Sequence, residues 1–555
     1  MPTDPDPRAA AHAATTPATA ALVASDPAAG APAGASAPAA GSEAASAARS
    51  SAMVTAGIVL SRLVGLIRQR VTAHFFGTSE IADVLAAAFR AGNITQNLLG
   101  EGTLSATFIP VYARLRASGE PRRAAHFALS ALGLLLVAAA AASALGVVAA
   151  PWLSFLIAAG FDEEKLASTT RIVRIIFPMT GLLVLSAWGL GVLNAHRRFF
   201  LPYAAPVAWS AAQIAGLLAC GAWLGMRGEP LAEALAWSAF GGAALQLALL
   251  LPSARSLLGG LQPRFDARDP SVREAGAKLP AALLGRGIIQ VSGLVDTLLV
   301  SFLGAGANAA FNYAQTIYLL PMSVLGTGEA AVALPEMARD TAEANVARRN
   351  EALSRRLGAS LARITVLTVP TTAVFMVLGG ELITLLLQTG TFDRASTARV
   401  EPLVCAYGLA LLGNASGRVL ITTCFALGDT RTPARYAAYR VLVSTGLALL
   451  LMQRLDVLGV VLGAVAAGWV EAIALAYRVR REIGGLGLDQ IRIGRVAALT
   501  AASVGAGVAL RAALPDALAA TPWGAALVLS ACGGAFAIAA PALGLFSLRS
   551  LLRRR

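Results

Sequence analysis

Long, continuous apolar runs separated by short arginine-rich segments make up the chain from about residue 53 onward. Runs such as 128–150, 175–193 and 497–514 hold about 20 residues each, enough for a helix to cross a hydrocarbon core of about 30 Å. The runs do not alternate between apolar and polar residues, which disfavours a membrane β-barrel. The pattern therefore predicts an all-α polytopic membrane protein.

We count about 14 transmembrane helices, and several of the predicted spans are longer than a bilayer is thick. We therefore expect bends or tilts, and Gly92, Gly100, Gly102 and Pro110 favour one within the second span. The predicted spans are 53–75, 80–112, 126–158, 168–193, 200–226, 232–252, 279–303, 308–337, 358–387, 401–427, 436–452, 457–477, 496–514 and 522–547.

Basic residues in the connections predict the orientation. Residues 1–50 are rich in Ala, Pro, Ser and Gly, and we interpret them as a disordered cytoplasmic tail. With the N-terminus inside, the cytoplasmic connections and the C-terminal end hold 27 Lys and Arg residues. The opposite side holds 6, counting Arg511 near the end of the span 496–514. Because positive charge favours the cytoplasmic side, both termini are predicted to face the cytoplasm.

Composition narrows the function classes further. The 555 residues are 56% hydrophobic and 14% charged, with a net charge of +14. The basic residues lie mostly between apolar runs, which reflects topology and predicts no nucleic-acid partner. The four cysteines and four histidines are dispersed, so no metal site is predicted.

An internal repeat indicates two similar halves. Residues 99–102, followed by Pro110, recur as residues 325–328, followed by Pro335, about 226 residues later. Such repeats are typical of transporters whose substrate path lies between the halves. We divide the chain into the cytoplasmic tail (1–50), an N-lobe with six helices (51–265), a C-lobe with six helices (266–482), and a final helix pair with a basic C-terminus (483–555).

Polar side chains inside the predicted spans are the candidates for binding a substrate, because they are costly to place in lipid. In the second span, Asp83, Arg90, Asn97 and Glu101 fall within roughly 40° of one helical stripe, which predicts a wet face. The strongest candidates are Arg62, Arg68, Asp83, Arg90, Glu101 and Arg286. Weaker candidates are Asn93, Gln96, Asn97, Asp296 and Thr316.

Two interpretations of these charges remain open. Guanidinium groups bind phosphate oxygens in pairs, so the arginines could bind an anionic head group. Alternatively, they form ion pairs between helices or extend to the membrane interface. For the arginines nearer to predicted span ends, we expect extension to the membrane interface: Arg171, Arg174, Arg363 and Arg440.

The sequence lacks a GxxxxGK[ST] phosphate-binding loop, so no ATP hydrolysis is predicted within the chain. Hydrolase motifs such as GxSxG with placed Asp and His are not evident either. We predict a transporter that is not an enzyme and has no cofactor, with a coupling ion or the membrane potential as sources of energy.

Several motifs together resemble a known family. The series begins with Ser-Arg-Leu-Val-Gly-Leu-Ile-Arg at 61–68 and continues with Phe-Gly at 76–77, Gly-Glu-Gly at 100–102 and Phe-Ile-Pro at 108–110. It goes on through Gly-Thr-Phe at 390–392 and Leu-Gly-Asp-Thr-Arg-Thr-Pro at 427–433. The order of these motifs over roughly 53–545 resembles the MurJ/MviN lipid II flippases of the MOP exporter superfamily.

The resemblance implies two six-helix lobes around a cationic cavity and a final helix pair beside the lipid tail. It also implies transfer of an undecaprenyl-diphosphate-linked peptidoglycan precursor to the outer leaflet of the bacterial plasma membrane. Membrane lipids and the cell-wall synthesis machinery are the implied partners. By position, Arg62 and Arg68 match functional arginines of the family, and Asp83 and Glu101 match its acidic positions.

The sequence departs from the family at Gln96 and Thr316, where the family commonly has arginine. Arg286 is a candidate to replace that charge by facing the central cavity, and its alternative is extension to the cytoplasmic interface. Lipid II flipping by alternating access is the leading hypothesis. The alternatives are export of another polyprenyl-linked glycan or of a small molecule, and a structural paralogue inactive in transport.

Overall fold

The structure, a computed structural model, describes residues 57, 60–198, 200–341, 343 and 345–545. Within these residues the fold is all-α, with one isolated β-bridge between Thr389 and Phe392 and no strand. Nine helices of this part are long and apolar enough to cross a membrane. The predicted fold class is confirmed, while the number of 14 spans remains a prediction.

The first bundle is organised around one long helix, α6 (Glu163–Ala195), which packs against α8, α4 and α2. Most of its second half is buried, including Trp188, whose indole donates a hydrogen bond to the backbone of Ala128. The other elements are a helix over 60–76, α2 (Glu80–Leu99), α3 (Glu101–Ala117), α4 (Pro121–Val148), α5 (Ala150–Ala158), α7 (Phe200–Leu217), the π-helical turn η2 (Leu218–Trp223) and α8 (Gly228–Leu258).

The second bundle is centred on α13 (Arg394–Ala426), which packs against α10 (Ala307–Asp340), α14 (Arg431–Ile483) and α11 (Val346–Val377). Helix α12 (Gly379–Leu386) follows α11 directly. Helix α14 is a hairpin of two helices, because Asp456 has φ 47° and Gly459 lies against the backbone of Leu451. This turn separates the two predicted spans 436–452 and 457–477.

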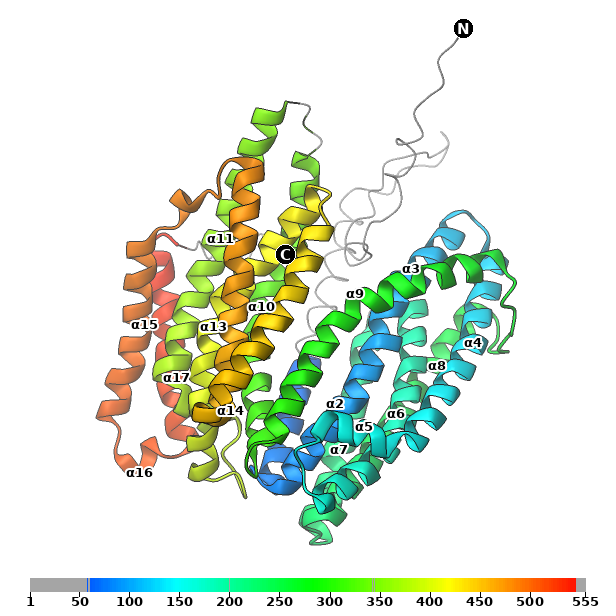
Figure 1. The fold of residues 1–555 in the computed structure, drawn as a ribbon, viewed down its shortest axis with the longest axis horizontal. Helices are drawn as coiled ribbons and strands as arrows, with labels where there is room; N and C mark the ends of the chain where they lie inside the picture. The colour runs from blue at the N-terminus through cyan, green and yellow to red at the C-terminus, as the bar shows by residue number, and fades with distance from the viewer. Residues whose placement is uncertain (1–56, 58–59, 199, 342, 344, 546–555) are drawn as a thin grey trace.

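A final helix pair lies beside the second bundle. The short 3₁₀ turn η3 (Leu488–Gln490) leads into α15 (Ile493–Ala513), and α16 (Asp516–Ala519) connects it to α17 (Pro522–Ala542). Helix α15 packs against α11, and α17 packs against α15 and α12. The pair thus covers the side of the second bundle that lies away from the first (Figure 1).

Three long predicted spans are divided in the structure. The span predicted over 80–112 breaks at Gly100, whose φ of −92° and ψ of −132° are not helical. The spans predicted over 126–158 and 358–387 divide near Ala149 and Leu378. Pro110, by contrast, lies inside α3 without ending it.

The two bundles meet at one end and diverge toward the other (Figure 1). Helix α9 (Pro270–Ser301) runs between them and contacts α2, α3 and α5 of the first bundle and α14 and α10 of the second. We call the end where the bundles meet the closed end, and the opposite one the open end. Polar residues near α9 are therefore positioned between the two bundles.

Candidate functional site between the two helical bundles

Asp83 connects the two bundles at the closed end through hydrogen bonds. Its carboxylate accepts hydrogen bonds from the backbone N–H groups of Gly306 and Ala309, at 2.7 and 2.9 Å, and is 3.2 Å from the Lys165 ammonium. Asp83 belongs to α2, whereas Gly306 and Ala309 form the N-terminus of α10, where the helix dipole favours negative charge. The side chain of Asp83 is fully buried.

Backbone contacts strengthen this closure. The N–H of Thr391 donates to the carbonyl of His74 at 2.9 Å, and the imidazole of His74 lies 3.0 Å from the Thr389 hydroxyl. The hydroxyl of Thr78 also lies 3.1 Å from the hydroxyl of Ser396 on α13. Within the second bundle, the guanidinium of Arg399 donates to the carbonyl of Ala305 at 2.7 Å and holds the segment before α10. A Cβ on Gly390 would lie 2.4 Å from the His74 carbonyl, so glycine is required for the two segments to approach.

Arg90 connects the bundles deeper inside. Its Nε donates to the carbonyl of Gly293 and to the hydroxyl of Thr297, both at 3.2 Å and both on α9. A Cβ on Gly293 would lie 2.7 Å from Nη2 of Arg90, so the guanidinium occupies space that glycine leaves open. Asp296, on the same helix, interacts electrostatically with Arg90.

Asp296 also interacts with Arg440 of α14, which forms an ion pair of 2.9 Å with Glu471 of the same hairpin. The expectation that Arg440 extends to the interface is wrong, because Glu471 lies within reach on the adjacent helix. Arg363 likewise pairs with Glu329 of α10. Charges from α2, α9 and α14 thus form a row between the bundles.

The two arginines of the first helix lie in different surroundings. Arg62 is exposed and has no partner among the described residues. Arg68 turns toward α7, where its Nη1 donates to Gln213 at 3.2 Å and its guanidinium lies 5.0 Å from the Trp209 ring centroid. Its Nε is buried without a partner. Neither arginine has a carboxylate within 4 Å in the described part of the chain.

The polar stripe predicted along the second span is not one continuous wet face. Asp83 is buried against α10, Arg90 is half-buried against α9, and Asn97 is exposed. The break at Gly100 also separates α2 from the residues that follow. Asp83 and Arg90 do not form an ion pair with each other, because Asp83 pairs with Lys165.

The remaining predicted site residues are partly accessible. Asn93 is exposed, and Gln96 and Thr316 are half-buried. The side chains of Glu101 and Arg286 lie outside the described residues, although both positions belong to helices, α3 and α9. The hypothesis that Arg286 replaces lost charge therefore stays a prediction.

Sequence reasoning missed Arg418 of α13, an exposed arginine 17 residues into the predicted span 401–427. It interacts electrostatically with Arg440 and with Tyr318 of α10. An ionisable residue well inside a predicted span was the signal that could have identified it.

Ion pairs at the open end link α3 to α9. Glu274 contacts Arg114, and it accepts a hydrogen bond of 2.9 Å from Lys278. These two partners lower the pKa of Glu274 to about 2. The carboxylate therefore stays charged at neutral pH.

A three-residue cluster near the open end has ligand types suited to a metal: His126, Asp266 and Asp269. Several of their atoms have partners in the protein: Oδ1 of Asp266 and Oδ1 of Asp269 accept backbone N–H groups, and Arg264 lies 3.2 Å from His126 Nδ1. The His126 hydrogen bond, the largest cause, holds the pKa of Asp266 below its usual range. These hydrogen bonds hold the three side chains together near the open end.

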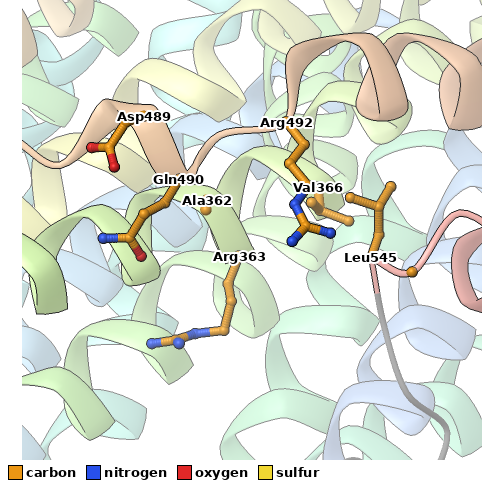
Figure 2. A pocket seen from close by; sticks show the side chains of 8 residues that line it. Ala362, Arg363, Val366, Asp489, Gln490, Arg492 and Leu545 are labelled. Atoms are coloured by element: carbon orange, nitrogen blue, oxygen red, sulfur yellow. The ribbon is translucent and has the colours of Figure 1, made fainter.

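A separate cavity of about 440 Å³ lies where η3, α11, α15 and the segment after α17 meet (Figure 2). Arg492 and Leu545 border one side, and Gln490 and Asp489 border the other. Arg363, the remaining cation of its lining, is already paired with Glu329. The cavity lies apart from the row of charges between the bundles.

The fold is similar to the folds of two solved transporter structures. A solved structure titled "Lipid II flippase MurJ, inward closed conformation" has a TM-score of 0.70 at 18% identity, covering 90% of this chain and 99% of that one. An inward-facing multidrug resistance MATE family transporter of the MOP superfamily has a TM-score of 0.62 at 17% identity, covering 77% of this chain and 95% of that one.

The sequence places the protein within one family. A model of the lipid II flippase MurJ family matches residues 72–524. The probable lipid II flippase MurJ of Rhizobium meliloti (strain 1021) is 32% identical, over 75% of this chain and 77% of its own. The lipid II flippase MurJ of Burkholderia cenocepacia is 29% identical, over 69% of this chain and 74% of its own. The chain belongs to the MurJ lipid II flippase family, and it is a multi-pass membrane protein.

Proposed function

We propose that this protein moves lipid II, a polyprenyl-diphosphate-linked peptidoglycan precursor, from the inner to the outer leaflet of the bacterial inner membrane. Family membership over residues 72–524 supports the reaction. The observation that carries the proposal to this chain is a group of three arginines. Arg90 and Arg440 belong to the row of charges between the bundles, and Arg418 of the second bundle interacts with Arg440. Arg90, Arg418 and Arg440 provide three guanidinium groups beside two carboxylates, which favours an anionic head group.

Alternating access is the mechanism that this geometry supports. The arginine-rich connections, including those near Arg114 and Arg264, lie at the open end, and the positive-inside rule assigns that end to the cytoplasm. Both termini would then be cytoplasmic. Separating Asp83 from the N-terminus of α10 would open the opposite end, where the head group leaves.

The energy for each cycle would come from outside the chain, since the sequence has no phosphate-binding loop. A coupling ion or the membrane potential would act on the charges between the bundles. Enzymes of cell-wall synthesis would then consume the product on the outer side. In this proposal, lipid II is moved across the membrane and the protein makes or breaks no covalent bond in it.

Complementation tests the proposal directly. The full-length chain should restore growth and shape to cells depleted of their own lipid II flippase, and purified protein in vesicles should make labelled lipid II accessible on the opposite leaflet. Failure of both, in a protein that inserts and melts cooperatively, would refute it.

A second candidate is the transport of another polyprenyl-linked glycan. Gln96 and Thr316 stand where the family commonly has arginine, so the contacts to the head group differ here. Competition between lipid II and a different polyprenyl-diphosphate glycan in the same vesicles would distinguish the two. Preference for the second glycan would favour this alternative.

A further inference from the structure

Arg418 lies inside the second bundle and not on its lipid-facing side. Asn414, one helical turn earlier on the same face of α13, donates a hydrogen bond of 2.7 Å to the hydroxyl of Tyr318 on α10. The neighbouring Gly417 lies against Ala472 of α14. Arg418 is therefore positioned between α10 and α14, although it is exposed.

The charge of Arg418 is not neutralised by the protein. The described residues provide no carboxylate within 4 Å of it and no hydrogen-bond acceptor for its guanidinium. Its charged neighbour is Arg440, which repels it and is already paired with Glu471. A positive charge at membrane depth without a counter-charge is costly and usually marks a substrate or ion pathway.

Arg418 and Arg440 lie at similar depths along their helices, measured from the connection between α13 and α14. Arg418 is eight residues before the end of α13, and Arg440 is nine residues after the start of α14. At 1.5 Å per residue, each lies about 12–14 Å from the helix ends that the connection over 427–430 joins. Two cations at one depth on adjacent helices suit the two phosphates of a diphosphate.

We propose that Arg418, together with Arg440, contacts the diphosphate of the lipid substrate from the second bundle. This role supplies positive charge in the second bundle, where Thr316 of the neighbouring α10 is uncharged. The inference rests on the proposed function and assigns a head-group contact to a residue that the family motifs do not include.

The test compares four full-length proteins in vesicles: wild type, Arg418→Gln, Arg418→Lys and the control Arg435→Gln. Arg435 is also exposed, lies on α14 and has no carboxylate within 4 Å among the described residues, so its variant removes the same charge. The measurements are the dissociation constants of undecaprenyl diphosphate and undecaprenyl phosphate, the rate of lipid II flipping, and the unfolding midpoint.

We expect Arg418→Gln to weaken binding of undecaprenyl diphosphate by about tenfold or more, the loss expected for charge-assisted hydrogen bonds. Binding of the monophosphate should change less, so the preference for diphosphate shrinks. Arg418→Lys should recover part of the affinity, and Arg435→Gln should resemble wild type. Because a purely structural role would lower both affinities and the unfolding midpoint together, the ratio of the two affinities is decisive.

An unchanged affinity and preference in Arg418→Gln would overturn the inference. If Arg418→Gln does not fold, an unchanged preference in Arg418→Lys, which lacks the paired donors of guanidinium, would overturn it as well. Failure of the proposed function gives a different result: wild type would not flip lipid II at all, whatever the variants do to diphosphate binding.

Discussion

The contact between Asp83 and the N-terminus of α10 stabilises the conformation in which the closed end is shut. We consider Asp83→Asn, which preserves shape and removes the charge. The carboxylate accepts two backbone N–H groups, at 2.7 and 2.9 Å, and an ammonium at 3.2 Å. The amide keeps one acceptor oxygen and turns an NH₂ donor toward other donors.

The magnitude follows from these contacts. Hydrogen bonds to a charged group contribute about 1.5–3 kcal/mol each, and removing one partner of a buried ion pair costs about 3–5 kcal/mol. Lys165, 12% exposed, loses its partner. Since part of the bonding survives, we expect the closed end to be destabilised by about 3 kcal/mol, on the order of 100-fold in the conformational equilibrium.

Distances between spin labels on the two bundles provide the assay. Labels at Glu164 and Ala398, both exposed near the closed end, should gain a longer-distance population in Asp83→Asn. The control is Asp162→Asn at the same end, which removes a carboxylate charge without removing a contact between the bundles. It keeps the N-cap of α6, because the amide oxygen can still accept the backbone N–H of Lys165. An Asp83→Asn protein whose label distances match those of the control would refute the reasoning.

Three further predictions concern other parts of the site. Gly293→Ala should displace the Arg90 guanidinium and slow flipping severalfold, whereas Gly287→Ala, which has open space on the same helix, should not; equal rates in both variants would contradict this. Arg62→Ala should abolish transport and leave the unfolding midpoint unchanged, since the side chain is exposed and unpaired among the described residues. Arg68→Ala should abolish transport and also lower the midpoint, because it loses the contacts with Gln213 and Trp209. Restored growth with both variants would refute the cationic site. The lowered pKa of Glu274, about 2, contributes stability above about pH 4.5 that is lost as the pH falls toward 2. Because the side chain is 34% exposed and its partner Arg114 is 59% exposed, solvent screens the ion pair, and we expect less than about 1 kcal/mol in melts between pH 5 and 2.5. This pH dependence should be absent from Glu274→Gln, and its persistence there would contradict the assignment.

Hydrophobic patterning alone determined the class of the protein and much of its layout. A helix must remain apolar for about 20 residues to cross a bilayer, so each span can be predicted from its own residues alone. Local chemistry was also enough to predict a break within the second span and the separation of the two halves of α14. Only the structure showed that Gly100, and not Gly92 or Pro110, is where the second span breaks. The motifs over roughly 53–545 further indicated the family.

The partners of the charged residues depended on the tertiary structure. Asp83 contacts residues 82 and 223 positions away, Arg68 contacts Gln213, and Arg440 contacts Glu471 across a hairpin. Helical periodicity places a side chain on a face but does not say which helix packs against that face. Arg440 was therefore misassigned to the interface and Arg418 was missed, because the packing of α10, α13 and α14 decides whether an arginine meets lipid, a carboxylate or the space between helices.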